Sequence, residues 1–349
     1  MTSTLLHIWT AYVTIILFAG SCTFHPPGYY IAINGATQGT SYHITYESND
    51  SINYQPEIDT LLRQFDLSLS TYEPASIISR INRDEENVEL SDLFINCFNA
   101  SRQIFEETGG AFDITVAPIV NAWGFGFTEK SDPDSAMIDS LLQFVGMDKI
   151  KLENGKIIKD HPGVMLDVNA IAQGYAVDVV SEYLESKGIT NYLVEIGGEV
   201  RTTGINPRGQ IWRVGIDKPI DGIQIPGMQM EAIIRLKNRS LATSGNYRRF
   251  YMKDGVKYSH TIDPATGYPV WHNLLSATVL ADECMIADGF ATAFMVLGLE
   301  KSKEILKNKK NLDAYLIFTN EKGQYDVFYT RGLRKFLMKP SCTNVYKRK

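Results

Sequence analysis

The stretch MLDVNAIAQGYAVDVV at residues 165–180 decides most about the fold. Residues 164–168 form an apolar run that predicts a buried strand, and residues 171–187 have the apolar spacing of a helix. We expect Asn169 to be the N-cap, so that the helix begins near Ala170. A helix start presents free N–H groups and the positive end of the helix dipole, which favour phosphate. Strand-to-helix corners are also common for purely structural reasons, so the corner alone leaves both interpretations open.

Outward from this corner, the apolar spacing alternates between the periods of strands and helices. Strands are predicted at 29–33, 40–46, 192–196, 212–216, 231–236, 250–252, 276–280, 314–318 and 325–329, and further helices at 58–69, 91–108, 285–297 and 300–308. Asn34-Gly35 is expected to form the turn of the first hairpin. Strands and helices mix without strict βαβ alternation. This predicts an α+β fold, a mixed sheet-and-helix arrangement with two intimately packed lobes.

Composition excludes several classes of protein. The chain has 349 residues, 44% of them hydrophobic, and 34 basic against 40 acidic side chains give a net charge of −6. Such a chain can bury a large core, which excludes disorder and a small disulfide scaffold. The sequence contains no run of five like charges and so gives little reason to expect binding to nucleic acid. We expect a small molecule or another protein as partner. Cys97 and Cys284 lie in apolar helical patterns and are expected to be buried thiols.

The N-terminus is typical of an exported protein. Residues 1–21 carry no Asp, Glu, Lys or Arg, and an apolar run ends in Ala-Gly-Ser-Cys at 19–22. This resembles the lipobox of bacterial lipoproteins, so we expect a lipoprotein signal peptide at 1–21 and lipidation of Cys22. A tether at 22–30, a folded domain at 31–338 and a basic tail at 339–349 would follow. A signal anchor is the alternative, but the run is short beside the roughly 20 residues that a membrane span needs.

Asp288 and Thr292 form the strongest local signal for chemistry. On a helix they are four positions apart, so a carboxylate and a hydroxyl project from one face of an apolar element. Two oxygens in this arrangement suit a hard cation such as Mg²⁺, with water, phosphate and carbonyl oxygens completing its shell. The alternative is structural: Asp288 caps a helix or makes a buried hydrogen bond, and Thr292 bonds to the carbonyl four residues back.

Two further groups of residues suggest a site. His260 and Asp263 lie in the turn sequence YSHTIDPATGYP, and His has an unperturbed pKa near neutrality, as a general base requires. The same sequence is also an ordinary Asp-Pro turn. Aromatic rings around Tyr72 and Phe112 could stack on a flavin or adenine, although most aromatic residues belong to cores. The common dinucleotide fingerprint and the P-loop are missing from the sequence.

Eight blocks of sequence, taken together, resemble the ApbE family of FAD:protein FMN transferases. The resemblance covers roughly residues 36 to 332, and the blocks are GTSYHITY, STYEPASIISRIN, GAFDITVAPIVNAWGFG, LDVNAIAQGYAVD, YLVEIGGEVRTTG, ATSGNYRRFY, SHTIDPATGYP and ADGFATAFMVLG. The family implies an enzyme outside the cytoplasmic membrane that uses Mg²⁺ to split FAD. It joins FMN through a phosphoester to a Ser or Thr of a partner protein, and AMP leaves.

The resemblance also implies roles for individual residues. The metal ligands would be the carbonyl of Ala170 and the side chains of Asp288 and Thr292. Contacts to FAD would fall at Gln38, Tyr72, Ala111, Phe112, Asp113, Asp167, Gln173 and Ile262. His260 is the candidate base for the acceptor hydroxyl, and Asp263 would position its loop.

Two departures from the family pattern bear on the cofactor. The family often has Met where Gln38 stands, and Lys or Glu where Gln173 stands; Gln can hydrogen-bond FAD but supplies no charge. An FAD pyrophosphatase that releases FMN and AMP to water is one alternative function. A lipid-anchored flavin-binding protein without turnover is the other. The lipobox and the motifs together predict an enzyme in the bacterial cell envelope, lipid-anchored and facing the periplasm or exterior, with an exported or membrane redox protein as acceptor.

Overall fold

An antiparallel sheet of eight strands forms the centre of the computed structural model, which describes residues 28–127, 133–220, 229–246, 250–253 and 256–338. In sheet order the strands are β1 (Tyr29–Thr37), β2 (Thr40–Ser48), β5 (Tyr192–Ile196), β6 (Glu199–Thr203), β9 (Arg239–Gly245), β12 (Leu274–Ala281), β13 (Asp313–Thr319) and β14 (Tyr325–Tyr329). Every pair of neighbours is antiparallel. The predicted α+β class is confirmed.

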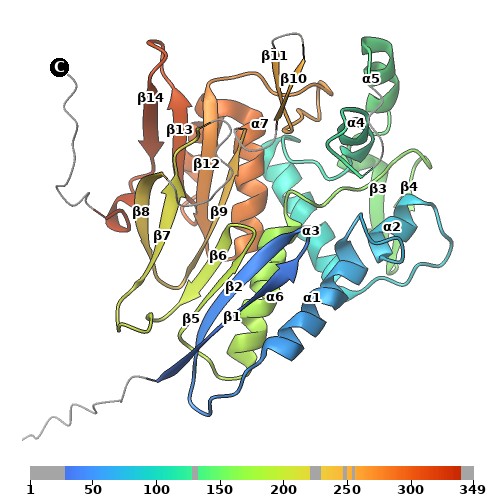
Figure 1. The fold of residues 1–349 in the computed structure, drawn as a ribbon. Helices are drawn as coiled ribbons and strands as arrows, with labels where there is room; N and C mark the ends of the chain where they lie inside the picture. The colour runs from blue at the N-terminus through green and yellow to red at the C-terminus, as the bar shows by residue number, and fades with distance from the viewer. Residues whose placement is uncertain (1–27, 128–132, 221–228, 247–249, 254–255, 339–349) are drawn as a thin grey trace, which may run out of the picture.

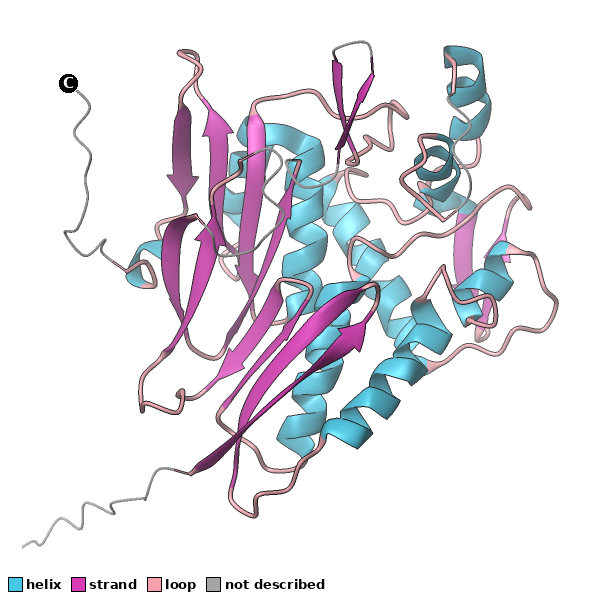
Figure 2. Ribbon diagram, viewed as in Figure 1, coloured by secondary structure: helices cyan, strands magenta, loops and turns pink. Residues whose placement is uncertain are grey.

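Helices cover one face of this sheet (Figure 2). The α-helices of the described residues are α1 (Gln55–Leu69), α2 (Ile77–Asn82), α3 (Asp92–Thr108), α4 (Ala117–Ala122), α5 (Ser135–Leu142), α6 (Ala172–Ser186) and α7 (Cys284–Asn308), and α4 and α5 lie to one side of the sheet. Helices α6 and α7 pack directly on the strands, and α1 and α3 pack outside them (Figure 1). Large side chains such as Tyr42, Tyr192, Phe290 and Phe294 fill the main core between these layers. Helices α6 and α7 therefore run through the middle of the molecule, between the sheet and the outer helices.

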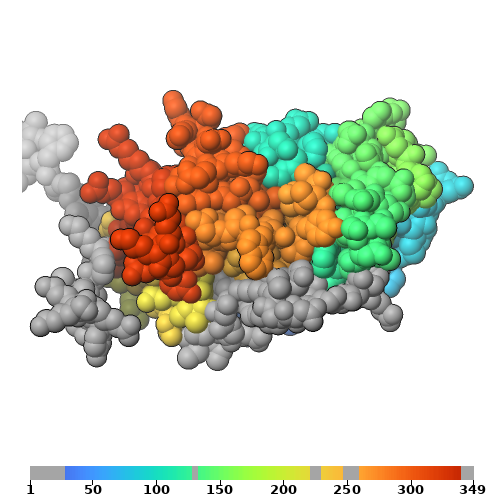
Figure 3. All heavy atoms as spheres, turned by 90° about the horizontal axis from the view of Figure 1, so that it is seen from above, coloured from blue at the N-terminus to red at the C-terminus, as the bar shows by residue number. Residues whose placement is uncertain are grey.

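Three hairpins complete the fold. The pair β7 (Trp212–Asp217) and β8 (Met230–Leu236) covers the other face of the sheet, where Ile216 and Ile234 join a second core with Leu241 and Leu280. The others are β3 (Ile150–Glu153) with β4 (Lys156–Lys159), and β10 (Phe250–Lys253) with β11 (Val256–Ser259). A third core of Ile119, Trp123, Ile138 and Ile262 joins α4 and α5 to the loop after β11. Seen from above, residues 260–269, in orange, lie against the green segment that contains α5 (Figure 3).

The predicted turn of the first hairpin is wrong. Strand β1 continues through Asn34-Gly35, and the turn is Gln38-Gly39, with φ of 50° and 70°. Two residues of positive φ give the tight turn that suits the twist of the strands. Gly35 has another role, because a Cβ there would lie 2.6 Å from the ring of Tyr42.

The corner at 165–180 also differs from its prediction. Residues 164–168 contain no strand, and only Met165 forms an isolated parallel bridge, with Val116. The cap of α6 is Ile171, and the N–H of Asn169 instead binds Asp167 Oδ1 at 2.8 Å. The break predicted at Gly298 is confirmed, because α7 consists of two helices that meet at this residue, whose φ of 74° is not helical.

None of the helices in the described ranges has the length and apolarity that crossing a bilayer requires. Cys22, the signal peptide and the tail at 339–349 lie outside the described residues. Those assignments stay predictions.

Candidate functional site

The starts of α6 and α7 meet at Asp288 and Gly174. Asp288 is buried, and its Oδ2 accepts the N–H of Gly174 at 3.0 Å. An unbroken helix would direct this N–H at the carbonyl of Ala170, and no described residue donates a hydrogen bond to that carbonyl. A Cβ on Gly174 would lie 2.4 Å from the carbonyl oxygen of Cys284. Glycine therefore allows the two helices to approach closely enough for the Asp288 bond.

Thr292 lies on α7 and faces β9. Its hydroxyl is 3.1 Å from Ser244 Oγ on β9. Asp288 lies four residues earlier on α7, so both side chains lie at the junction of α6, α7 and β9. Two neighbouring polar atoms, Asn246 Oδ1 and Ser276 Oγ, are buried with no hydrogen-bond partner among the described residues. Such atoms are rare in folded proteins and mark places where a ligand or water completes the structure. The sequence interpretation missed both, although Asn246 belongs to the quoted motif ATSGNYRRFY.

The electrostatics of this junction favour a cation. Burial, followed by the charge of Glu199, raises the pKa of Asp288 well above its ordinary value, and the hydrogen bond from Gly174 acts in the opposite direction. A bound cation would favour the ionised carboxylate, as opposite charges do. Glu199, itself buried, is a further acidic group that motif reasoning did not single out.

The donor set fits a hard divalent cation. The described part of the chain holds no group of three or more His, Cys, Asp or Glu side chains that would form a metal site alone. One carboxylate, one hydroxyl and one free carbonyl instead leave positions for water and substrate oxygens. Mg²⁺ is usually held in this way, because it dehydrates reluctantly and binds few protein ligands.

Gln38 lies in the turn between β1 and β2, and its side chain has an unusual environment. Both amide atoms of the side chain are buried, and neither has a hydrogen-bond partner among the residues that the structure describes. An unpaired buried amide costs free energy, so the geometry fits a polar ligand that would bind it. Gln173 lies nearby, since its amide nitrogen is 2.9 Å from where a Cβ on Gly197 would stand, and Gly197 N–H donates to Ser41. The two Gln residues thus share one end of the sheet.

Asp113 and Asp167 come from adjacent segments. The N–H of Asp167 donates to the carbonyl of Ile114 at 2.7 Å, and both carboxyls are buried. Burial raises the pKa of Asp113 to about 6, and it also raises that of Asp167. The amide of Asn82 binds both backbone groups of Leu166, at 2.8 and 2.7 Å, and so fixes the position of Asp167. Asn82 is a positioning residue that sequence reasoning missed, although it ends the motif STYEPASIISRIN.

The aromatic residues divide into two groups. Tyr72 is 63% exposed, so its ring can stack on a ligand, whereas Phe112 lies in the main core. Only the backbone of Phe112, and of Ala111 after two glycines of positive φ, is suited to a ligand contact. The predicted buried thiols, Cys97 and Cys284, are confirmed.

Backbone contacts hold the loop that follows His260. Ile262 pairs with Pro269, and Asp263 Oδ1 accepts the N–H of Ala265 at 2.9 Å. Asp263 thus shapes the turn through its own backbone neighbours. His260 is half-buried, and its ring lies edge-on to Phe125 with 6.4 Å between centroids.

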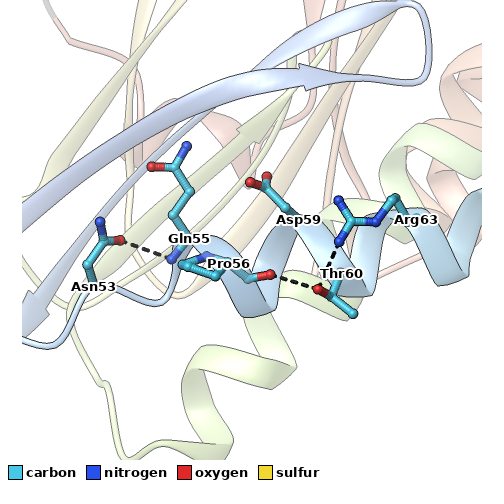
Figure 4. Close-up of a pocket in the computed structure, with 6 residues that line it drawn as sticks. All are labelled: Asn53, Gln55, Pro56, Asp59, Thr60 and Arg63. Atoms are coloured by element: carbon cyan, nitrogen blue, oxygen red, sulfur yellow. Dashed lines mark hydrogen bonds between the residues drawn. The ribbon is translucent and has the colours of Figure 1, made fainter.

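A cavity of about 430 Å³ lies elsewhere, under the β1–β2 hairpin (Figure 4). Its lining is polar and comes from α1 and the residues before it: Asn53, Gln55, Pro56, Asp59, Thr60 and Arg63. None of the site residues predicted from the sequence lines it. We therefore place the site at the α6–α7–β9 junction.

Comparison with known proteins finds relatives over most of the chain. Residues 38–316 match the model of the ApbE family. The chain is 35% identical over 339 residues to the FAD:protein FMN transferase of Vibrio cholerae, which covers 95% of this chain and 99% of that protein. It is 38% identical over 307 residues to the FAD:protein FMN transferase of Haemophilus influenzae, with coverages of 84% and 88%.

Solved structures show the same fold. The flavin transferase ApbE from Vibrio cholerae superposes with a TM-score of 0.80 at 35% identity, covering 89% of this chain and 100% of that chain. The apo form of the Pseudomonas stutzeri flavinyl transferase ApbE gives a TM-score of 0.78 at 32% identity, with coverages of 88% and 96%.

Proposed function

The chain belongs to the ApbE family, and we propose that it is a transferase that moves FMN from FAD to a Ser or Thr hydroxyl of an acceptor protein and releases AMP. The relatives from Vibrio cholerae and Haemophilus influenzae are named for this activity, and the chain aligns with 99% and 88% of their lengths. The observation that carries the proposal is the junction at which Asp288 reaches the start of α6. Oxygen atoms that suit a divalent cation would then lie beside a helix start that suits phosphate, and this supports cleavage of a diphosphate here.

Mg²⁺ is the metal we propose, held by Asp288, Thr292 and the carbonyl of Ala170. Bound there, it would neutralise charge on the pyrophosphate as AMP departs. The chain contributes the rest of the electrostatics, because the start of α6 directs its positive end toward the same place. Ser244 holds the hydroxyl of Thr292 in position.

The FAD contacts are also part of the proposal. Gln38 and Gln173 would donate and accept hydrogen bonds at one end of the sheet, and Tyr72 would stack. Asp113 and Asp167, with the backbone of Ala111 and Phe112 and the apolar side chain of Ile262, would complete the binding surface. The unpartnered amide of Gln38 supports this assignment, because a ligand would satisfy it.

His260 is the proposed base for the acceptor hydroxyl. It would take the proton during in-line attack on the phosphorus, while the turn shaped by Asp263 holds the imidazole in place. Asp263 is then a positioning residue. Loss of the proton to His260 makes the acceptor oxygen a stronger nucleophile.

The location of the enzyme is part of the proposal. The uncharged segment at 1–21 and the Ala-Gly-Ser-Cys at 19–22 support export and a lipid anchor on Cys22. The protein would then face the periplasm or exterior of a bacterial envelope, and its acceptor would be an exported or membrane redox protein.

One incubation tests this function. Purified protein, FAD and Mg²⁺ are mixed with candidate exported redox subunits and analysed by in-gel flavin fluorescence and by AMP release. We expect one AMP for each flavin that becomes attached to the acceptor, and chelation of the metal should stop both. AMP without a labelled acceptor would replace this function with that of an FAD pyrophosphatase. FAD retained without AMP would indicate a flavin-binding protein.

A further inference from the structure

Asp178 caps a helix to which it does not belong. It lies on α6, is 2% exposed, and accepts the N–H of Cys284 through Oδ1 at 2.9 Å and that of Met285 through Oδ2 at 2.8 Å. These are the first two N–H groups of α7, and the helix's own N-cap, Glu283, supplies no side-chain hydrogen bond. A carboxylate on a neighbouring helix therefore satisfies the donors that a helix start leaves free.

A second contact runs in the opposite direction. Asp288 lies one turn after Cys284 on α7, and it accepts the N–H of Gly174, which lies one turn before Asp178 on α6. Each helix thus supplies the carboxylate that caps the other. Two such contacts, a turn apart and of opposite direction, fix both the rotation and the translation of α7 against α6.

Arg201 holds Asp178 in this orientation. Its Nη1 is 2.9 Å from Asp178 Oδ1, and its Nη2 is 3.2 Å from Glu185, also on α6. The guanidinium comes from β6, so the sheet anchors the carboxylate that sets the helix pair. Glu185 shares Arg201 but has no hydrogen bond or ion pair with α7 among the residues described.

The proposed metal ligands lie on both sides of this contact. The carbonyl of Ala170 precedes α6, whereas Asp288 and Thr292 belong to α7. The distance between the carbonyl and the two side chains therefore depends on how the helices are aligned. We propose that Asp178 is the positioning residue of the metal site, because it sets the alignment of α7 against α6 while touching no ligand itself. This inference rests on the proposed function.

Asp178→Asn tests the proposal. Asn keeps the shape and one acceptor oxygen, but its amide group would face an N–H of α7, so one capping bond is lost. Mn²⁺ is the probe, titrated into the FAD-free protein and followed by electron paramagnetic resonance. We expect the Kd for Mn²⁺ to rise at least tenfold, and AMP release from FAD to recover at high Mg²⁺, which a purely structural defect would not allow.

Glu185→Gln is the matched control. It removes a partner of Arg201 without touching α7, so its Mn²⁺ affinity should stay within twofold of the wild type. Unchanged affinity in a folded Asp178→Asn protein overturns the proposal. If that variant does not fold, Asp178→Glu takes its place, since it keeps the charge but displaces the carboxylate; unchanged Mn²⁺ affinity there overturns the proposal too. Wild-type protein that binds no Mn²⁺ overturns the metal site itself.

Discussion

Trp123 and Gly267, 144 positions apart in the chain, are joined by a hydrogen bond of 2.8 Å from the indole Nε1 to the carbonyl oxygen. The bond links the end of α4 to the turn that Asp263 shapes, and Ile262 packs in the same small core as the indole. The position of the His260 loop is therefore set by a segment much earlier in the sequence. Flavin transfer should depend on this contact although neither residue is proposed to touch the reacting atoms.

Trp123→Phe should slow flavin transfer at least fivefold. The change keeps an aromatic ring but leaves the carbonyl of Gly267 without its donor, which costs about 1–2 kcal/mol of unfolding free energy. Trp212→Phe is the control, because Trp212 is 7% exposed, as Trp123 is, and its indole N–H donates to the carbonyl of Thr203. We expect urea unfolding to show a similar loss of unfolding free energy in both variants. Flavin transfer should be slower only in Trp123→Phe. Equal transfer rates would contradict the role of the Trp123 contact.

Gly174→Ala should destabilise the protein by about 2 kcal/mol, although alanine is the better helix former. The new Cβ would lie 2.4 Å from a backbone oxygen of α7 and 2.7 Å from Asp288 Cβ. Gly289→Ala provides the comparison, since its Cβ would meet the flexible end of Ile104. Thermal unfolding should show the larger loss for Gly174→Ala, and the reverse order would show that the helices are not in tight contact.

Gln38→Met should weaken FAD binding about tenfold without lowering the stability of the ligand-free protein. The amide has no partner in the described part of the chain, so its removal relieves a buried polar group but would delete the proposed contact to FAD.

Gln55→Met should behave in the opposite way. Its amide donates to the carbonyl of Asn34 and to the hydroxyl of Tyr42, so its loss should lower stability and leave FAD affinity unchanged. FAD titration by fluorescence and urea unfolding measure both properties. Equal FAD affinity in the Gln38 variant and the wild type would remove Gln38 from the site.

Asp113→Asn should change how stability depends on pH. Burial raises the pKa of Asp113 to about 6 from 3.8, so between these values the folded state binds more protons than the unfolded state. Its contribution to stability is complete below the lower value and is lost as the pH rises through 6. One such group changes the unfolding free energy by at most about 1.4 kcal/mol per pH unit.

The variant should therefore lose less stability between pH 4 and pH 6 than the wild type loses. Asp178, whose pKa burial also raises to about 6, would leave part of the dependence in place. Urea unfolding at several pH values measures the difference. Identical slopes in the two proteins would show that Asp113 does not carry the proton.

The local spacing of apolar residues predicted those helices and strands whose bounds are visible in their own sequence. Strands 192–196 and 325–329 have the predicted bounds, and the helix predicted at 91–108 begins one residue later, after Ser91 as its cap. The same reasoning failed at Gly35, because the ring of Tyr42 that requires a glycine there lies on the partner strand. It also placed the cap of α6 at Asn169, since the nearest polar side chain was assumed to cap the helix.

The site could be predicted only in part for the same reason. Asp288 and Thr292 are four residues apart, and that spacing is visible in the sequence. Asn82 and Asp178 act on partners more than 80 positions away, so no local spacing reveals them. The carboxylate that caps α6 comes from α7, and only the packed structure shows this exchange.

The most direct test of the central claim is Asp288→Ala, assayed with FAD, Mg²⁺ and an acceptor protein. Asp282→Ala is the control, because Asp282 lies just before α7 and is exposed. In-gel fluorescence should show flavinylated acceptor with the wild type and the control, and no labelled acceptor with Asp288→Ala. Full labelling by a folded Asp288→Ala protein would contradict the assignment of the metal and of the site built around it.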